Sequence, residues 1–283
     1  MPLYPMTRLL SEAQRVGYAV GAFNAHTLDM IPPIVAAAEA ERSPLILQFS
    51  PGALRFAGVH NVAALAKDLA LRSELPIALH LDHGERFEQI VECIEAGFTS
   101  VMIDGSRLPF EDNIALTARV VEAAKVSAVT VEAELGHVGG AEDALTAGER
   151  SQLYTDPSLA AEFVRRTGVD CLAVAIGTAH GFYTWEPKLD FERLAQLRRT
   201  LTIPLVLHGA SDLPDEQVRQ AVRGGIQKIN IATDLKAPWA EAVRRALADP
   251  AEIDPRKILA PANQAVREAV QRKMRLFGCS GQV

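Results

Sequence analysis

The chain has 283 residues, of which 48% are hydrophobic and 23% are charged, and its formal net charge is −6. This balance is that of a folded globular protein with a large core, and the length suits a single α/β barrel. The mild acidity argues against nucleic acid as the main partner, because phosphate backbones require a basic stripe. The net charge does not exclude a small phosphorylated ligand, which needs only a local positive pocket.

Neither a membrane-spanning segment nor an oxidising compartment is expected. No apolar run approaches the roughly 20 residues that a transmembrane helix needs, and the first residues lack the charged-then-apolar order of a secretion signal. The cysteines, Cys93, Cys171 and Cys279, are odd in number and have no CxxC spacing, which predicts free thiols. We therefore expect a cytoplasmic protein.

Eight short apolar segments alternate along the chain with eight segments of helical periodicity. The apolar segments are rich in Val, Ile and Leu and mostly continuous, as in strands of a parallel sheet that are buried on both faces. In chain order, the predicted strand and helix pairs cover 18–24 and 29–42, 44–50 and 61–72, 76–82 and 87–97, 99–105 and 110–125, 127–135 and 159–168, 171–177 and 191–200, 203–209 and 215–225, and 226–232 and 234–248.

This alternation predicts an α/β fold, a single (β/α)8 TIM barrel over residues 1–283. Three helix-to-strand units, "EAGFTSVMIDG", "RTGVDCLAVAIG" and "RGGIQKINIA", share one plan in which a glycine ends the helix. The alternative is an open doubly wound sheet. Eight units without the composition of a separate second domain favour the barrel.

Two segments depart from the regular alternation. The connection at about 136–157 is long for a compact domain, and such connections are often lids over functional sites, so a mobile loop is expected here. Residues 261–277 have an amphipathic pattern with several basic residues on the polar side. They predict an extra C-terminal helix that covers the barrel or lies in a subunit interface.

Three histidines follow three different predicted strands: His83 in "HLDHG", His180 in "GTAHG" and His208 in "LHGAS". In a TIM barrel the carboxyl ends of the strands form the active site. A lone histidine there is most simply a structural hydrogen-bonding residue. Three neutral imidazoles with an open fourth position, however, are the usual ligand set of catalytic zinc. The three together therefore predict a zinc site.

The motifs "HLDHG", "AELG" followed by "GG-ED", "GTAHG", "LHGAS" and "NIAT" together resemble those of class II, metal-dependent ketose-bisphosphate aldolases in order, spacing and overall length. Each motif alone is weak, but five at the expected strand ends are specific. Within the family, "VDCLAVAIGTAHGFY" and "PLVLHGASDLPDE" are most similar to the tagatose-bisphosphate branch. The resemblance implies that the protein is a lyase that requires Zn²⁺ and forms a homodimer or homotetramer. Whether it also needs Na⁺ or K⁺ is left open.

The resemblance also implies which residues surround the metal. The three histidines match the zinc ligands, Glu134 matches a carboxylate that approaches the metal when the site is empty, and Asp104 matches an acidic residue near the metal. From the residues alone, Asp104 is equally a cap or turn residue, because "DGS" is turn-like. Glu132 is interpreted as a structural residue or one that supports a ligand.

Two carboxylates match the proton-transfer residues of the family. Asp82 matches the residue that exchanges the proton of the C4 hydroxyl, and the alternative is an aspartate that orients a zinc-bound histidine. Because adjacent strand residues point to opposite faces, Asp82 and His83 can share a site only if the strand bends, which Gly84 would allow. Glu142 matches the loop carboxylate that moves the carbon-bound proton of dihydroxyacetone phosphate; otherwise it is a solvated surface residue.

The phosphate pocket is expected after the seventh and eighth strands, its usual location in such barrels. Small residues there let backbone N–H groups reach an anion. Asn24 and Ser50, at the ends of two predicted strands, resemble positions that hold substrate oxygens. Their alternative role is to cap the strand ends. The predicted substrate-binding residues are Asn24, Ser50, Gly181, Gly209, Ala210, Ser211, Asn230, Ile231, Ala232 and Thr233.

The expected reaction is reversible cleavage of a ketose 1,6-bisphosphate, tagatose first and fructose second, to dihydroxyacetone phosphate and glyceraldehyde 3-phosphate. Thr184 and Trp185 stand where some relatives have a lysine, and Ala232 where fructose-specific relatives can have an acid. Another aldehyde, even an unphosphorylated one, is therefore an alternative partner. A lysine Schiff base is the other chemical route, but no lysine stands clearly at a strand end. A zinc hydrolase and a noncatalytic aldolase-supporting subunit are further alternatives.

Overall fold

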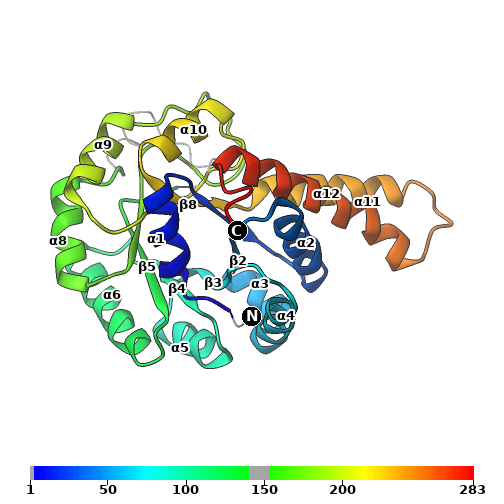
Figure 1. The fold of residues 1–283 in the computed structure, drawn as a ribbon, viewed down its shortest axis with the longest axis horizontal. Coiled ribbons are helices and arrows are strands. Elements are labelled where there is room, and N and C mark those ends of the chain that lie inside the picture. Colours follow the sequence, from blue (N-terminus) through cyan, green and yellow to red (C-terminus); the bar gives the residue numbers. More distant parts are fainter. Residues whose placement is uncertain (1–2, 140–152) are drawn as a thin grey trace.

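The computed structural model describes residues 3–139 and 153–283, which form a closed barrel of eight parallel strands with helices around it (Figure 1). The strands follow one another around the barrel in sequence order. The predicted TIM barrel is confirmed. The strands are β1 (Val20–Asn24), β2 (Leu45–Phe49), β3 (Ile77–Gly84), β4 (Ser100–Ile103), β5 (Thr130–Leu135), β6 (Cys171–Val174), β7 (Leu205–Leu207) and β8 (Ile226–Ile231).

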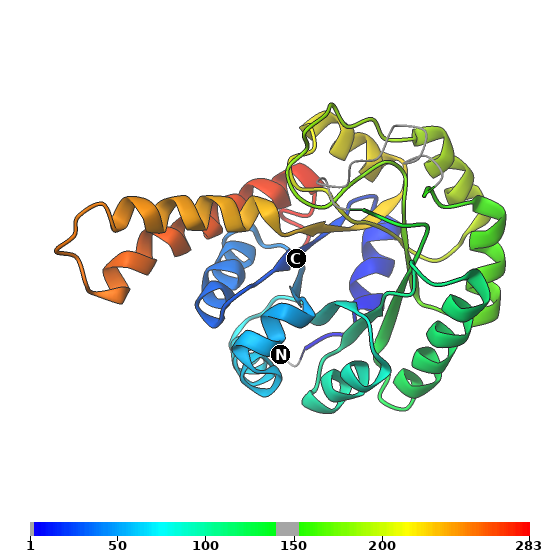
Figure 2. The same ribbon diagram turned by 180° about the vertical axis from the view of Figure 1, so that it is seen from behind.

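Helices connect the strands and cover the outside of the barrel (Figures 1 and 2). All eight predicted helical segments are present, and α1 and α3 are additional. The helices are α1 (Met6–Val16), the 3₁₀ turn η1 (Leu28–Met30), α2 (Ile31–Glu41), α3 (Pro51–Ala57), α4 (Val59–Arg72), α5 (Phe87–Ala96), α6 (Phe110–Lys125), α8 (Pro157–Thr167), α9 (Phe191–Thr200), α10 (Asp215–Arg223), α11 (Thr233–Ala246) and α12 (Pro255–Phe277). No helix of the described residues is long and apolar enough to cross a membrane.

The strands consist of residues that are buried on both faces, as their continuous apolar runs predict. Every residue of β1, β2 and β8 is buried. Glycines in the left-handed conformation end α5 at Gly97 (φ 97°) and α8 at Gly168 (φ 66°), as two of the repeated units predict. In the third unit the left-handed residue is the second glycine, Gly225 (φ 99°). These caps let each helix turn directly into the next strand.

Helix α1 lies across the N-terminal end of the barrel (Figure 1). Its residues Met6 and Leu10 are fully buried. The backbone N–H of Thr7 donates to the hydroxyl of Thr130, at the start of β5, over 3.1 Å. The helix therefore covers this end, and the opposite end carries the carboxyl termini of the strands.

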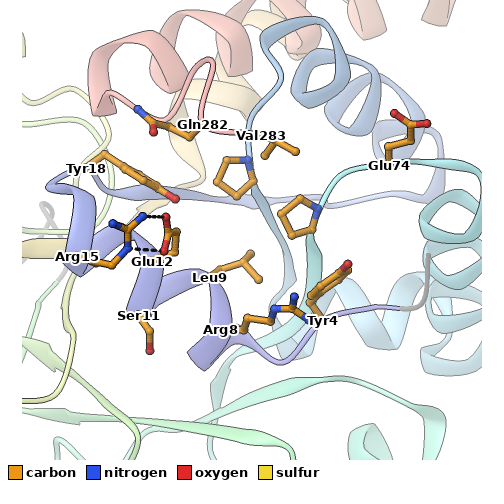
Figure 3. Close-up of a pocket in the computed structure, with 12 residues that line it drawn as sticks. Tyr4, Arg8, Leu9, Ser11, Glu12, Arg15, Tyr18, Glu74, Gln282 and Val283 are labelled. Carbon is orange, nitrogen blue, oxygen red and sulfur yellow. Dashed lines mark hydrogen bonds and ion pairs between the residues drawn. The ribbon is translucent and has the colours of Figure 1, made fainter.

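A cavity of about 540 Å³ lies beside α1, near the beginnings of the strands (Figure 3). Tyr4, Leu9 and Tyr18 line it, and Glu12 forms an ion pair with Arg15 at its edge. Its lining includes none of the predicted site residues that the structure describes. It lies at the other end of the barrel from the candidate active site.

Helices α11 and α12 form a hairpin that projects from the barrel (Figures 1 and 2). The predicted C-terminal helix is confirmed as α12, although it begins at Pro255 rather than near residue 261. Asp254 caps this earlier start by accepting a hydrogen bond from the backbone N–H of Arg256 (3.0 Å), and Pro261 is accommodated inside the helix. The far end of α12, at the buried Phe277, packs against β1 and α2. Its place in a subunit interface stays a prediction.

Candidate active site

Three imidazole rings converge at the carboxyl end of the barrel. His83 lies at the end of β3, and His180 and His208 follow β6 and β7. The ring centroids are 4.7 Å apart for His83 and His208, 5.1 Å for His83 and His180, and 6.1 Å for His180 and His208. One ligand atom of each residue lies within 4.8 Å of the others. This arrangement allows all three to bind one metal ion.

Carboxylates contact one nitrogen of two of these rings. Asp104 Oδ2 lies 2.8 Å from His83 Nδ1, and Glu132 Oε1 lies 2.8 Å from His208 Nε2. The other ring nitrogens, His83 Nε2 and His208 Nδ1, are buried and have no hydrogen-bond partner among the described residues. A buried polar atom without a partner is costly, and a carboxylate on the far nitrogen is the usual way to orient a metal-binding imidazole.

Glu134 approaches the same point from β5. Its side chain is buried, and its Oε2 has no hydrogen-bond partner in the part of the chain that is described. This oxygen lies 3.0 Å from His208 Nδ1, while Oε1 accepts a hydrogen bond from the backbone N–H of Val138 (3.1 Å). Glu134 also forms a second group of potential ligands with His83 and Asp104. Its carboxylate can therefore bind a cation at this point.

The charges around the rings favour a cation. Burial by itself lowers the pKa of His83, but the Asp82 carboxylate and a hydrogen bond to Asp104 raise it to about 10. The field that favours a proton on this imidazole also favours a bound metal ion. Four carboxyl groups and one lysine form the charged surroundings: Asp82, Asp104, Glu132, Glu134 and Lys228.

Strand β3 bends at the predicted place. The pairing of β3 with β4 shifts register between Leu81 and Gly84, and His83 itself has a left-handed backbone (φ 52°). The bend places Asp82 Oδ1 3.9 Å from His83 Nε2. Gly84 has a different role from the predicted one, because a Cβ there would lie 2.7 Å from the carbonyl oxygen of Met102. It permits close packing of the strands, whereas His83 makes the turn.

Two asparagine amides hold the Asp82 carboxylate. Asn24 Nδ2 donates to Oδ2 (2.7 Å), and Asn230 Nδ2 donates to Oδ1 (3.0 Å). Gln48 Nε2 in turn donates to Asn24 Oδ1 (2.7 Å). Burial alone raises the pKa of Asp82, but the positive charges of His83, Lys228 and His208 and the hydrogen bond from Asn24 together lower the pKa to about 2. Asp82 is therefore an oriented carboxylate beside the three histidines.

A cavity of about 280 Å³ opens next to the histidines, at the N-terminal end of α11. The Ser211 hydroxyl accepts hydrogen bonds from the backbone N–H groups of Ala232 and Asp234 (3.3 Å each). Helix N-termini and small-residue loops present N–H groups to anions, and Lys236 adds a positive charge that the sequence pattern did not single out. The lining residues are Asn24, Asp82, His83, His180, Gly181, Gly209, Ser211, Asn230, Ala232, Thr233 and Lys236.

Three predicted substrate-binding residues do not line this cavity. The Ser50 hydroxyl accepts a hydrogen bond from the backbone N–H of Ala53 (3.4 Å), so it caps the start of α3 rather than the end of the strand. Ala210 and Ile231 are fully buried, Ile231 as part of the strand wall. The predicted catalytic residue Glu142 lies outside the described residues.

Lys228 has a larger role than its apolar sequence context indicates. Its side chain is fully buried, and its Nζ lies 3.0 Å from Glu132 Oε2 and 2.6 Å from Asn230 Oδ1. Lys228 and Asn230 are two positions apart on β8 and thus share a face, a signal that the sequence contained. Lys228 does not line the cavity, so a Schiff base at this residue has no support.

The family model for class II fructose-bisphosphate aldolases matches residues 4–282. The chain belongs to this family. This class II aldolase is 47% identical over 276 residues to the D-tagatose-1,6-bisphosphate aldolase subunit GatY of Klebsiella oxytoca, covering 97% of each chain. Its fold matches the crystal structure of the YdjI aldolase of Escherichia coli K12 with a TM-score of 0.87, at 34% identity and over 99% of both chains.

These comparisons confirm the predicted family and reaction class: the protein is an aldolase, a carbon–carbon lyase. Zinc dependence is typical of the class, and the three histidines offer the donor atoms for it.

Proposed function

We propose that this class II aldolase reversibly cleaves D-tagatose 1,6-bisphosphate to dihydroxyacetone phosphate and glyceraldehyde 3-phosphate. The observation that carries the proposal is the convergence of three imidazoles beside Asp82 and an anion-binding cavity. The choice of sugar is supported by the relative from Klebsiella oxytoca, which is named for tagatose 1,6-bisphosphate and is 47% identical over nearly the full chain.

We assign Zn²⁺ to His83, His180 and His208. The fit is supported by two unpartnered ring nitrogens aimed into the site and by its excess of carboxylates. Bound zinc would act as a Lewis acid that stabilises negative charge on the substrate oxygens. Asp104 and Glu132 would orient the imidazoles that they contact. Glu134 would approach the metal position when the substrate is absent.

Asp82 would accept the proton of the C4 hydroxyl while the C3–C4 bond breaks and the C4 aldehyde forms. The electron pair of that bond passes to the three-carbon fragment, which then takes a proton at C3 to become dihydroxyacetone phosphate. We assign this second proton to Glu142, which lies on the loop outside the described residues. Asn24 and Asn230 keep Asp82 aimed at the site by their hydrogen bonds to its two oxygens.

The phosphate of the dihydroxyacetone half would lie in the cavity at the start of α11. Gly181, Gly209 and Ser211 offer close backbone approach or a hydroxyl, Thr233 opens the helix, and Lys236 supplies positive charge. This leaves the aldehyde half on the side of the histidines away from α11.

A coupled cleavage assay on the purified chain tests the proposal, comparing tagatose and fructose 1,6-bisphosphate with and without a zinc chelator. We expect cleavage of both sugars, faster for tagatose, and its loss with the chelator and return with added zinc. Full activity without metal would contradict the mechanism. Release of inorganic phosphate would indicate a hydrolase, and faster condensation of dihydroxyacetone phosphate with an unphosphorylated aldehyde would indicate another natural substrate.

The Klebsiella oxytoca relative is named as a subunit. Because this chain keeps the three histidines and Asp82 in one place, we propose that it is catalytic by itself rather than a supporting subunit. Turnover by the isolated chain tests this directly. A homodimer or homotetramer, and a requirement for Na⁺ or K⁺, stay predictions for light scattering and for assays with replaced salts.

A further inference from the structure

Lys228 contacts two groups of side chains in the candidate site at once. Its Nζ contacts Glu132 Oε2 at 3.0 Å on one side and Asn230 Oδ1 at 2.6 Å on the other. Glu132 leads to His208, and Asn230 leads to Asp82. All these contacts are buried, so water does not replace them.

We propose that Lys228 is a positioning residue that fixes both the metal-binding imidazole of His208 and the proton-transferring carboxylate of Asp82 through one ammonium group. The inference rests on the proposed function, in which these two side chains hold zinc and move the hydroxyl proton. It assigns to a strand residue outside the cavity a role in both metal affinity and turnover.

The first of the two connections runs from Lys228 through Glu132 to His208. Glu132 Oε1 lies 2.8 Å from His208 Nε2, and this contact fixes the ring with Nδ1 facing the site, 3.0 Å from Glu134 Oε2. The second oxygen of Glu132 is held by Lys228. Within residues 3–139 and 153–283, no other lysine or arginine forms an ion pair with Glu132. Without Lys228, this carboxylate would keep its contact with His208 but lose its lysine partner, with His80 left at 3.6 Å from its second oxygen.

The second connection runs from Lys228 through the Asn230 amide to Asp82. Its Nδ2 donates to Asp82 Oδ1 (3.0 Å), and its Oδ1 accepts from Lys228 Nζ (2.6 Å). An ammonium group can only donate, so the amide cannot turn over without placing its NH₂ against Lys228 and its oxygen against the Asp82 carboxylate. Lys228 therefore selects the orientation in which Asn230 holds Asp82.

A merely structural ion pair between β8 and β5 would stabilise the fold and do nothing more. Removing Lys228 alone leaves the Glu132 charge buried without a partner, which can unfold the protein. The informative variant is therefore the double substitution Lys228→Met with Glu132→Gln, which removes both charges together, compared with Glu132→Gln alone, from which it differs only at Lys228. Replacing a buried ion pair by neutral side chains is often close to neutral for stability.

We expect the folded double variant to bind zinc about tenfold more weakly or worse, as for the loss of other groups that orient metal ligands. We expect kcat to fall by about 100-fold with KM changed by less than about threefold, because the substrate contacts remain. Zinc competition with a chromophoric chelator, circular dichroism and cleavage kinetics measure these quantities. Lys273→Met is the matched control: it removes another buried lysine, which pairs with Asp234 over 2.6 Å, and zinc affinity should change by less than about twofold.

A readout on metal-free protein separates this inference from the proposed function. Nitrogen-15 NMR of the chelated wild type should show one pair of signals for the Asn230 side-chain amide, and the double variant should show two, because the amide can then turn over. The proposal is overturned if the folded double variant keeps the wild-type zinc affinity, or if it keeps a single pair of Asn230 amide signals. If the wild type cleaves no ketose bisphosphate, the proposed function fails, yet the zinc and NMR measurements still decide the role of Lys228.

Discussion

Asp82 and His83 are neighbours in sequence and face one another in space, with Asp82 Oδ1 3.9 Å from His83 Nε2. Regular strand geometry would point them in opposite directions. The left-handed backbone of His83 and the register shift of β3 bring both side chains to one side. A left-handed non-glycine residue costs about 1–3 kcal/mol, and strain of this kind tends to lie where chemistry requires it.

Asp82→Asn is expected to lower kcat for cleavage by at least about 100-fold, because it removes the group that takes the hydroxyl proton. Zinc content should stay at the wild-type level, since the three histidines are untouched. Exchange of the carbon-bound proton of dihydroxyacetone phosphate with water should persist, because we assign it to Glu142. Glu142→Gln should instead lose this proton exchange. Loss of the exchange in the Asp82 variant would contradict the assignment of the two protons to different residues.

His208→Ala is expected to abolish both zinc binding and aldol cleavage. Its Nδ1 is one of the two unpartnered ring nitrogens in the site. Metal analysis after dialysis and the coupled assay measure the two effects. His60→Ala, an exposed histidine on α4, is the control and should behave as wild type. Full cleavage by the His208 variant would exclude the zinc mechanism.

Lys236→Met is expected to raise KM for the sugar bisphosphate by about tenfold with little change in kcat, because it removes charge that binds ground and transition states alike. The effect should shrink as salt concentration rises, since screening weakens the wild-type contact. Lys257→Met removes an exposed lysine at the start of α12 and serves as the control. An unchanged KM in the Lys236 variant would place the phosphate elsewhere.

Chelation of zinc is expected to lower the melting temperature, because the metal binds the folded state. Free zinc at about 1,000 times its Kd stabilises a protein by about 4 kcal/mol. Calorimetry with and without a chelator measures the shift, and readdition of zinc should reverse it. The His208→Ala variant should show no shift, and a wild type that melts identically in both conditions would argue against a bound metal.

The three cysteines are expected to react slowly with thiol reagents in the native protein. All three are buried. Burial raises the pKa of Cys93 to about 12 and that of Cys279 to about 11, so little reactive thiolate is present near pH 8. Titration with an aromatic disulfide should detect three thiols in guanidinium chloride and almost none before unfolding. Rapid labelling of the native chain would show that one of these sites opens.

The barrel was predictable because its strands are buried on both faces and so have apolar runs that the sequence displays directly. The beginning of α12 was not, because Pro261 suggests a helix boundary, while the actual start depends on the Asp254 cap. Helix α1 shows a helical spacing from Met6 to Ala13. That spacing does not reveal that the helix covers the N-terminal end of the barrel.

The three histidines were predictable as a group because each follows a different strand of one barrel. The orientations of the His83 and His208 rings were not, because these depend on Asp104 and Glu132, which come from other parts of the barrel. The role of Ser50 differs for a similar reason: a serine at a strand end can bind substrate or cap the next helix, and only the position of the Ala53 N–H decides between them. Lys228 shows the limit most clearly, since its partner Glu132 lies across the barrel.

The contacts around the site form a continuous connection through the interior of the barrel. Its members are Gln48, Asn24, Asp82, Asn230, Lys228, Glu132 and His208. Lys236 and Ala232, by contrast, lie where β8 passes into α11 and face the cavity without belonging to this connection. Substitutions at Lys236 and Ala232 can thus alter how the cavity binds a phosphate while the connected interior residues are left as they are.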